Sequence, residues 1–80
     1  MKSSLDPRQV LLLSLLRNGR VSSNITQTSI AESLGKPQSW VSKVETGELE
    51  LSVVDFLSLC NVLKLDATQV ITALTKGQDE

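Results

Sequence analysis

Apolar side chains recur along this chain at intervals of three and four residues, the spacing that gathers them on one face of an α-helix. In the first such stretch, Leu12, Leu13 and Leu16 share a face. Residues that commonly cap or end helices separate the stretches. The pattern predicts a compact all-α domain, a five-helix bundle, with helices over residues 7 to 19 or 24, 27–34, 37–46, 53–63 and 67–76.

The first helix has a clear start and two candidate ends. Asp6 is suited to cap it, and Pro7 takes the first helical position, where its fixed φ and missing N–H are tolerated. Gly19 is one candidate end, although a glycine costs only about 1 kcal/mol inside a helix. Asn24 is the other, since asparagine tolerates the left-handed turn that often follows a helix.

The four later helices each carry an apolar face that can be buried in a shared core. Thr26, Ser52 and Asp66 are suited to cap three of them. The residues predicted to point inward are Ile30, Ala31 and Leu34 in the second helix, Val41 and Val44 in the third, Val53, Phe56, Leu57, Cys60 and Leu63 in the fourth, and Val70, Ile71 and Leu74 in the fifth.

The second and third helices are joined by a very short connection. Gly35 ends the second helix, Pro37 begins the third, and Gly47 ends it. Two or three residues cannot turn the chain back for the two helices to lie side by side. The connection therefore predicts a sharp crossing, which is the corner of a helix-turn-helix.

A chain of 80 residues suits one domain, which we expect to span residues 1–80 with tails over residues 1–5 and 77–80. The apolar run Val10–Leu16 is far shorter than the stretch of about 20 residues that crosses a bilayer. No small-residue cleavage site follows it, as a signal peptide would require. We therefore expect a cytoplasmic protein with no membrane partner.

The composition argues against catalysis and metal binding. The chain has no His and one Cys, Cys60, which lies in an apolar stretch and is interpreted as a core residue rather than a reactive thiol. Paired carboxylates and phosphate-binding loops are also absent from the sequence. We expect no catalytic residue, no metal, no cofactor and no enzyme activity.

The charges are unevenly spread along a chain whose net charge is −1. Residues 1–46 contain six basic and three acidic residues, whereas residues 47–80 contain two basic and six acidic ones. The first half can therefore present a locally positive face to a polyanion. An ordinary solvated surface explains the same charges, and charge alone does not decide between the two.

The third predicted helix has an unusual outer face. If Val41 and Val44 point inward, Gln38, Ser39, Ser42 and Lys43 project outward. A glutamine amide can donate to and accept from an adenine edge in the major groove, and a lysine reaches guanine or a phosphate. Solvated surface residues are the alternative, but the helix-turn-helix corner favours DNA, because residues near the start of such a helix meet base edges.

A longer stretch resembles the phage repressor/Cro family of DNA-binding domains, known as Xre-type. That stretch is "NITQTSIAESLGKPQSWVSKVETGELELS", Asn24 to Ser52. The family's pattern is roughly Gly-Leu-Thr-Gln, then Leu-Ala-x-x-Leu-Gly, then Gln-Ser-x-Ile-Ser-Arg-Ile-Glu-x-Gly. The resemblance covers about residues 15–66 and implies an all-helical, lambda-repressor-like domain that binds double-stranded DNA.

The resemblance also implies roles for individual residues. Gln27 would bond a DNA phosphate and brace Gln38, and Arg20 would form an internal ion pair with Glu45, although a phosphate contact is the alternative for Arg20. The residues expected to contact DNA are Gln27, Lys36, Gln38, Ser39, Trp40, Ser42, Lys43 and Thr46.

The chain departs from the family pattern at several positions. Asn24 stands where glycine is usual, and both residues suit a left-handed turn. Lys64 replaces a glycine after the fourth helix, at some conformational cost, and Gly19 replaces a bulky apolar residue, which predicts looser packing there. The loop after the third helix carries two acidic residues, Glu48 and Glu50, where relatives often place basic ones, which predicts weak binding by a single copy.

Trp40, the only tryptophan, has three interpretations. It can be half-buried against the second helix, as tryptophan often is. It can lie along the groove wall and donate its indole N–H to a phosphate. It can also contact a protein partner, since tryptophan is enriched at binding hot spots.

The leading hypothesis for function is a sequence-specific DNA-binding transcriptional regulator that binds an inverted repeat as a homodimer. The second is a protein-interaction module, antitoxin-like or accessory, that keeps the fold with weak or no specific DNA binding. Candidate dimer contacts, which are equally well explained as core, are Leu11, Leu15, Val70, Ile71 and Leu74.

Overall fold

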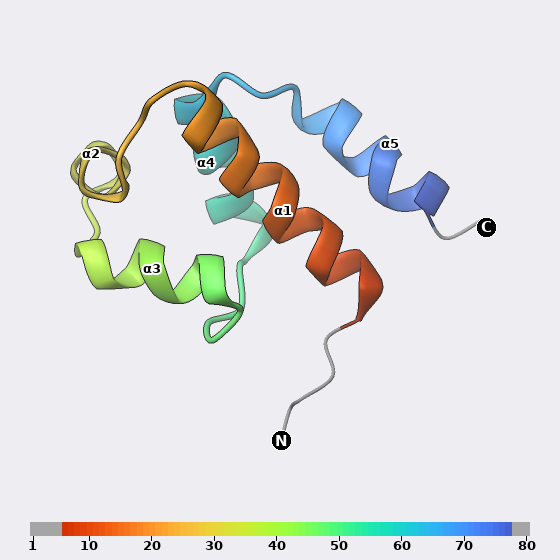
Figure 1. Ribbon diagram of the computed structural model, residues 1–80, viewed down its shortest axis with the longest axis horizontal. Helices are drawn as coiled ribbons and strands as arrows, with labels where there is room; N and C mark the ends of the chain where they lie inside the picture. The colour runs from red at the N-terminus through yellow and green to blue at the C-terminus, as the bar shows by residue number, and fades with distance from the viewer. Residues whose placement is uncertain (1–5, 78–80) are drawn as a thin grey trace.

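The computed structural model describes residues 6–77, and these form five α-helices with no strand among them (Figure 1). The all-α fold class is therefore confirmed. The fifth helix includes residue 77, which we had assigned to the C-terminal tail, and the rest of both predicted tails lies outside the described residues. The helices are α1 (Pro7–Ser22), α2 (Gln27–Leu34), α3 (Gln38–Thr46), α4 (Val53–Leu63) and α5 (Ala67–Gly77).

The start of α1 is built as predicted, and its end lies between the two candidates. Asp6 accepts the backbone N–H of Arg8 at 2.8 Å, and its carboxylate also binds the Arg8 guanidinium. These hydrogen bonds lower the pKa of Asp6 to about 2. The helix runs through Gly19 and ends at Ser22, and Asn24 then takes the left-handed conformation with φ 60°.

Three later helices begin on the side-chain caps that the sequence predicts. The bonds run from Ser29 N–H to Thr26 Oγ1 (3.0 Å), from Asp55 N–H to Ser52 Oγ (3.0 Å) and from Thr68 N–H to Asp66 Oδ1 (2.9 Å). In contrast, the prediction that α3 starts at Pro37 is wrong by one residue. Pro37 is the cap, because its ψ of 153° is extended, and the helix begins at Gln38.

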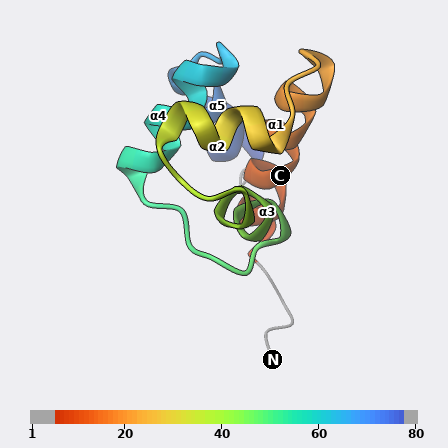
Figure 2. The ribbon, with the colours of Figure 1, turned by 90° about the vertical axis from the view of Figure 1, so that its left-hand side faces the viewer.

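The corner between α2 and α3 has the predicted sharp crossing. Gly35 ends α2 with φ 69°, a left-handed conformation that suits glycine, and only Lys36 and Pro37 follow before α3. Figure 1 shows α2 end-on with α3 in the plane of the picture, and Figure 2 shows the reverse. The two helices therefore lie steeply across each other.

One core joins the five helices, in which α1 packs on α3, α4 and α5, and α2 packs on α3 and α4. The buried residues include Ile30, which has no exposed surface. Trp40 and several leucines pack around this core. Its members are Leu16, Ile30, Ala31, Val41, Phe56, Leu59, Cys60, Leu63 and Val70.

The predicted inner face of α4 is partly wrong. Phe56, Cys60 and Leu63 are buried, but Leu59 joins them in place of Leu57, which is 51% exposed. Val53 is 73% exposed. Apolar residues occupy more than one face of this helix. The spacing of apolar residues alone therefore does not identify which face is buried. In α5 the same error places Ile71 inward, although it is 49% exposed.

Gly19 does not leave the loose packing that its small size predicts. A Cβ atom on this residue would lie 3.1 Å from Leu65 Cδ1 and 3.2 Å from Leu65 Cδ2. The side chain of Leu65 therefore fills the space that a larger residue in α1 would take.

Cys60 is a core residue, as predicted, with 2% of its surface exposed. Burial raises the pKa of its thiol, which keeps the sulfur protonated and unreactive at neutral pH. Within residues 6–77, no helix combines the length and the apolar character needed to cross a membrane.

Lys64 ends α4 in the left-handed conformation, with φ 60° and ψ 39°. This conformation costs a residue with a Cβ roughly 1–2 kcal/mol. We predict that Lys64→Gly raises the free energy of unfolding by about 1 kcal/mol, measured by urea denaturation. Lys64→Ala is the matched control, because it removes the same side chain without relieving the strain. Equal stability of the two variants would contradict this explanation.

Candidate nucleic-acid interface

The third helix presents its polar side chains on the outside of the molecule. Val41 and Val44 are each 2% exposed and hold α3 against the core, as predicted. Gln38, Ser39 and Lys43 are exposed, and Ser42 is half-buried. The helix lies at the edge of the fold (Figure 1), so its outer face is open to a large partner. No carboxylate within residues 6–77 forms an ion pair with Lys43.

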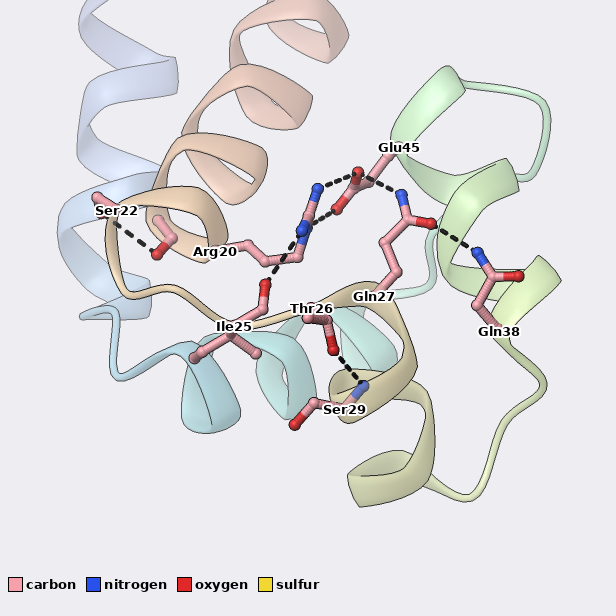
Figure 3. A network of polar contacts seen from close by, with 9 residues as sticks. Arg20, Ser22, Ile25, Thr26, Gln27, Ser29, Gln38 and Glu45 are labelled. Atoms are coloured by element: carbon pink, nitrogen blue, oxygen red, sulfur yellow. Dashed lines mark hydrogen bonds and ion pairs between the residues drawn. The ribbon is translucent and has the colours of Figure 1, made fainter.

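Gln38, at the start of this face, is held by α2. Its Nε2 donates to Oε1 of Gln27 at 2.7 Å (Figure 3). Gln27 is the first residue of α2, and the steep crossing of the two helices brings their starts together. The predicted bracing contact is therefore present, and it limits the rotamers that Gln38 can adopt before DNA arrives.

The predicted ion pair between Arg20 and Glu45 is also present. Arg20 Nε donates to Glu45 Oε2 at 2.6 Å and Arg20 Nη2 donates to Oε1 at 3.2 Å. The two side chains are only 13% and 12% exposed. A third bond, from Arg20 Nη1 to the carbonyl of Ile25 at 3.0 Å, fixes the loop between α1 and α2. The guanidinium thus joins α1, this loop and α3.

Glu45 has one further partner that the sequence did not reveal. Its Oε1 also accepts from Gln27 Nε2 at 2.9 Å, so one carboxylate binds residues of α1 and α2 (Figure 3). The two residues are 18 positions apart, and no local spacing rule connects them. The resemblance to a known family suggested the Arg20–Glu45 and Gln27–Gln38 contacts. It did not suggest the Gln27–Glu45 bond that connects them.

Trp40 lies half-buried against the core, which supports the packing interpretation of this residue. The ammonium of Lys36 lies 4.9 Å from the centre of its ring, within the range of a cation–π interaction. The same ammonium lies 4.0 Å from Asp55 Oδ1 on α4. Lys36 therefore ties the corner to α4, a role that the sequence did not predict, and its DNA contact stays a prediction.

Thr46 lies at the far end of α3, away from Gln38. Its Oγ1 donates to the carbonyl of Lys43 at 3.1 Å, within its own helix. Glu48 and Glu50 follow it in the loop and are exposed. The contact predicted between Thr46 and the DNA backbone is thus separated from the cluster of Gln27, Gln38 and Ser39.

The arrangement offers hydrogen-bond donors and acceptors on a helix that fits the major groove. Within the part of the chain that the structure describes, no three His, Cys, Asp or Glu side chains gather as metal ligands. Two helices crossing at a tight corner, the second with an exposed polar face, define the class of helix-turn-helix DNA-binding domains.

Comparisons with known proteins agree. Residues 11–71 match a family described as "Helix-turn-helix domain". The chain is similar to an "XRE-family like protein from Pseudomonas syringae pv. tomato str. DC3000", with 38% identity over 86% of this chain and 84% of that one, and a TM-score of 0.82. A comparison with curated proteins gives no match. This chain belongs to the Xre-type helix-turn-helix family of DNA-binding regulators.

The burial of the Arg20–Glu45 pair gives it a large effect on stability. We predict that Arg20→Met lowers the free energy of unfolding by about 3 kcal/mol, because it leaves the Glu45 carboxylate without its charged partner. Thermal and urea denaturation would measure the change. Arg8→Met is the matched control, since Arg8 also pairs with a carboxylate, that of Asp6, but both side chains of this pair are solvated, at 57% and 46% exposed. Equal effects of the two substitutions would contradict the argument from burial.

Proposed function

We propose that this protein is a sequence-specific transcriptional regulator that binds an inverted repeat in double-stranded DNA as a homodimer. The observation that carries the proposal is the Gln27–Gln38 hydrogen bond at the exposed start of α3. A side chain on a solvated surface usually has free rotamers, whereas Gln38 is held in place. An amide fixed where the helix would enter the groove supports base recognition rather than mere solubility.

The other predicted contacts fit this arrangement. Gln27 uses one N–H for Glu45, which leaves its second N–H for a phosphate. Lys43 lies one turn beyond Ser39 on the outer face and would reach a guanine or a phosphate. Ser42, Trp40, Lys36 and Thr46 would line the sugar-phosphate backbone on either side of the helix.

A dimer is supported by an apolar groove between α1, α4 and α5. Its volume is about 320 Å³, and the exposed side chains of Leu57, Val53 and Ile71 lie along it. Of the dimer candidates drawn from the sequence, Ile71 and Leu74 line this groove, while Leu15 packs against the core and Val70 is buried within it. A second copy covering the groove would supply the second α3 helix that an inverted repeat requires. The full lining is Leu12, Leu51, Val53, Phe56, Leu57, Ala67, Thr68, Ile71 and Leu74.

The second candidate function is a protein-interaction module without specific DNA binding. The exposed carboxylates of Glu48 and Glu50, directly after α3, favour it because they repel phosphates. The acidic balance of residues 47–80 adds to this. The two functions differ in what they require of Lys43.

Sequencing of sheared genomic DNA from the source organism, recovered on the protein at about 150 mM salt, tests the proposal. We predict enrichment of a few fragments that share an inverted repeat. Lys43→Glu should abolish the enrichment, because it places a negative charge against the DNA. Lys64→Glu, the matched charge change after α4, should leave it intact. Uniform recovery, or equal effects of both substitutions, would support the interaction module.

The dimer is tested by a pair of substitutions on α4. Leu57→Asp adds a charge to the apolar groove, whereas Val54→Asp adds the same charge at a 71% exposed position that does not line it. We predict that Leu57→Asp yields monomers in sedimentation experiments and weakens binding to the inverted repeat, while Val54→Asp changes neither. Circular dichroism would check the fold of both variants. A monomeric unmodified protein, or dimers of Leu57→Asp, would overturn the assignment of the groove.

A further inference from the structure

The polar side chains behind the recognition helix form one continuous chain of hydrogen bonds. Arg20 donates to Glu45, Gln27 donates to Glu45 at 2.9 Å, and Gln38 donates to Gln27 at 2.7 Å (Figure 3). The chain begins at a partly buried ion pair and ends at the side chain proposed to meet a base. Arg20 belongs to α1, Gln27 begins α2, and Gln38 and Glu45 lie at the two ends of α3.

The order of donors and acceptors in this chain is dictated by Glu45. A carboxylate paired with arginine is ionised and can only accept hydrogen bonds. Gln27 must therefore turn its NH₂ group toward Glu45, which leaves its carbonyl facing Gln38. Gln38 must then turn its own NH₂ group toward Gln27. An amide that is symmetric in shape is thereby given a single orientation.

This orientation decides which hydrogen-bonding groups of the Gln38 amide remain free to contact a base. One N–H is used on Gln27, so a single N–H and the carbonyl oxygen remain. Adenine presents an acceptor, N7, beside a donor, the N6 amino group, and matches this pair. Guanine presents two acceptors, N7 and O6, which would set its O6 against the Gln38 carbonyl. The opposite orientation of the amide would offer two N–H groups and favour guanine.

We infer that Glu45 is a positioning residue that selects adenine over guanine at the base pair read by Gln38, without touching DNA. The inference rests on the proposed function, because it requires Gln38 to face a base edge. Arg20 has a different part: it neutralises and holds Glu45, but it does not itself set the direction of the hydrogen bonds.

Two substitutions separate this role from a merely structural one. Glu45→Gln and Arg20→Met both break the buried ion pair and destabilise the fold. Only Glu45→Gln removes the obligate acceptor, because the new amide can donate to Gln27 and allow both glutamines to turn. In Arg20→Met the carboxylate remains and the orientation is kept. Gln27→Met adds an independent test, since it cuts the chain and leaves the ion pair intact.

The probe is a pool of DNA duplexes with a randomised centre of about 20 base pairs, which spans two half-sites one helical turn apart. Bound duplexes are sequenced for each variant at a temperature where circular dichroism shows it folded. We expect the adenine-to-guanine ratio at one position of each half-site to fall about tenfold in Gln38→Ala, Glu45→Gln and Gln27→Met. Arg20→Met should keep the ratio of the unmodified protein, although it binds less DNA overall.

The outcomes separate the inference from the proposed function. If Gln38→Ala changes the ratio but Glu45→Gln and Gln27→Met do not, Gln38 reads a base and Glu45 does not position it. If Glu45→Gln and Arg20→Met change the adenine-to-guanine ratio equally, the ion pair affects base preference only by stabilising the fold. The inference is then overturned. If Gln38→Ala changes nothing, or the pool shows no enrichment, base reading by Gln38 fails and the inference fails with it.

Discussion

The ion pair between Arg20 and Glu45 is the contact on which the arrangement of α1, α2 and α3 depends. Its atoms are largely withdrawn from solvent, and both Glu45 oxygens are bonded. Through it the end of α1, the loop before α2 and the last turn of α3 are held together. Helices of eight and nine residues, such as α2 and α3, are too short to be stable alone. Their relative placement therefore comes from this pair and from the burial of Val41 and Val44, the two valines of α3, in the core.

The sequence predicted much of the fold, because capping residues and apolar spacing act locally. Asp6, Thr26, Ser52 and Asp66 begin helices at the predicted places, and Gly35 and Gly47 end them in left-handed conformations. These local signals did not predict which face of α4 is buried. Leu57 and Leu59 are two residues apart and equally apolar, and only the positions of α1 and α2 decide which is covered.

The sequence named the residues of the candidate site, but it did not reveal all the hydrogen bonds and ion pairs between them. Gln27 and the Arg20–Glu45 pair came from family resemblance, whereas Gln38 followed from the helical spacing of the third helix. The bond between Glu45 and Gln27 joins residues 18 positions apart, and the link from Lys36 to Asp55 crosses from the corner to α4. Such contacts depend on tertiary geometry, which no periodicity encodes. The packing of Leu65 into the space beside Gly19 also depends on tertiary geometry.

Trp40 gives this protein an intrinsic optical label at its working surface. It is the only tryptophan, and its indole lies beneath the Lys36 ammonium, on the helix proposed to read DNA bases. Emission from such a ring responds to a nearby charge and to the polarity of its surroundings. A phosphate that draws the ammonium away from the ring would alter both at once. The arrival of DNA at α3 can therefore be followed by fluorescence in the unmodified protein, with no dye attached.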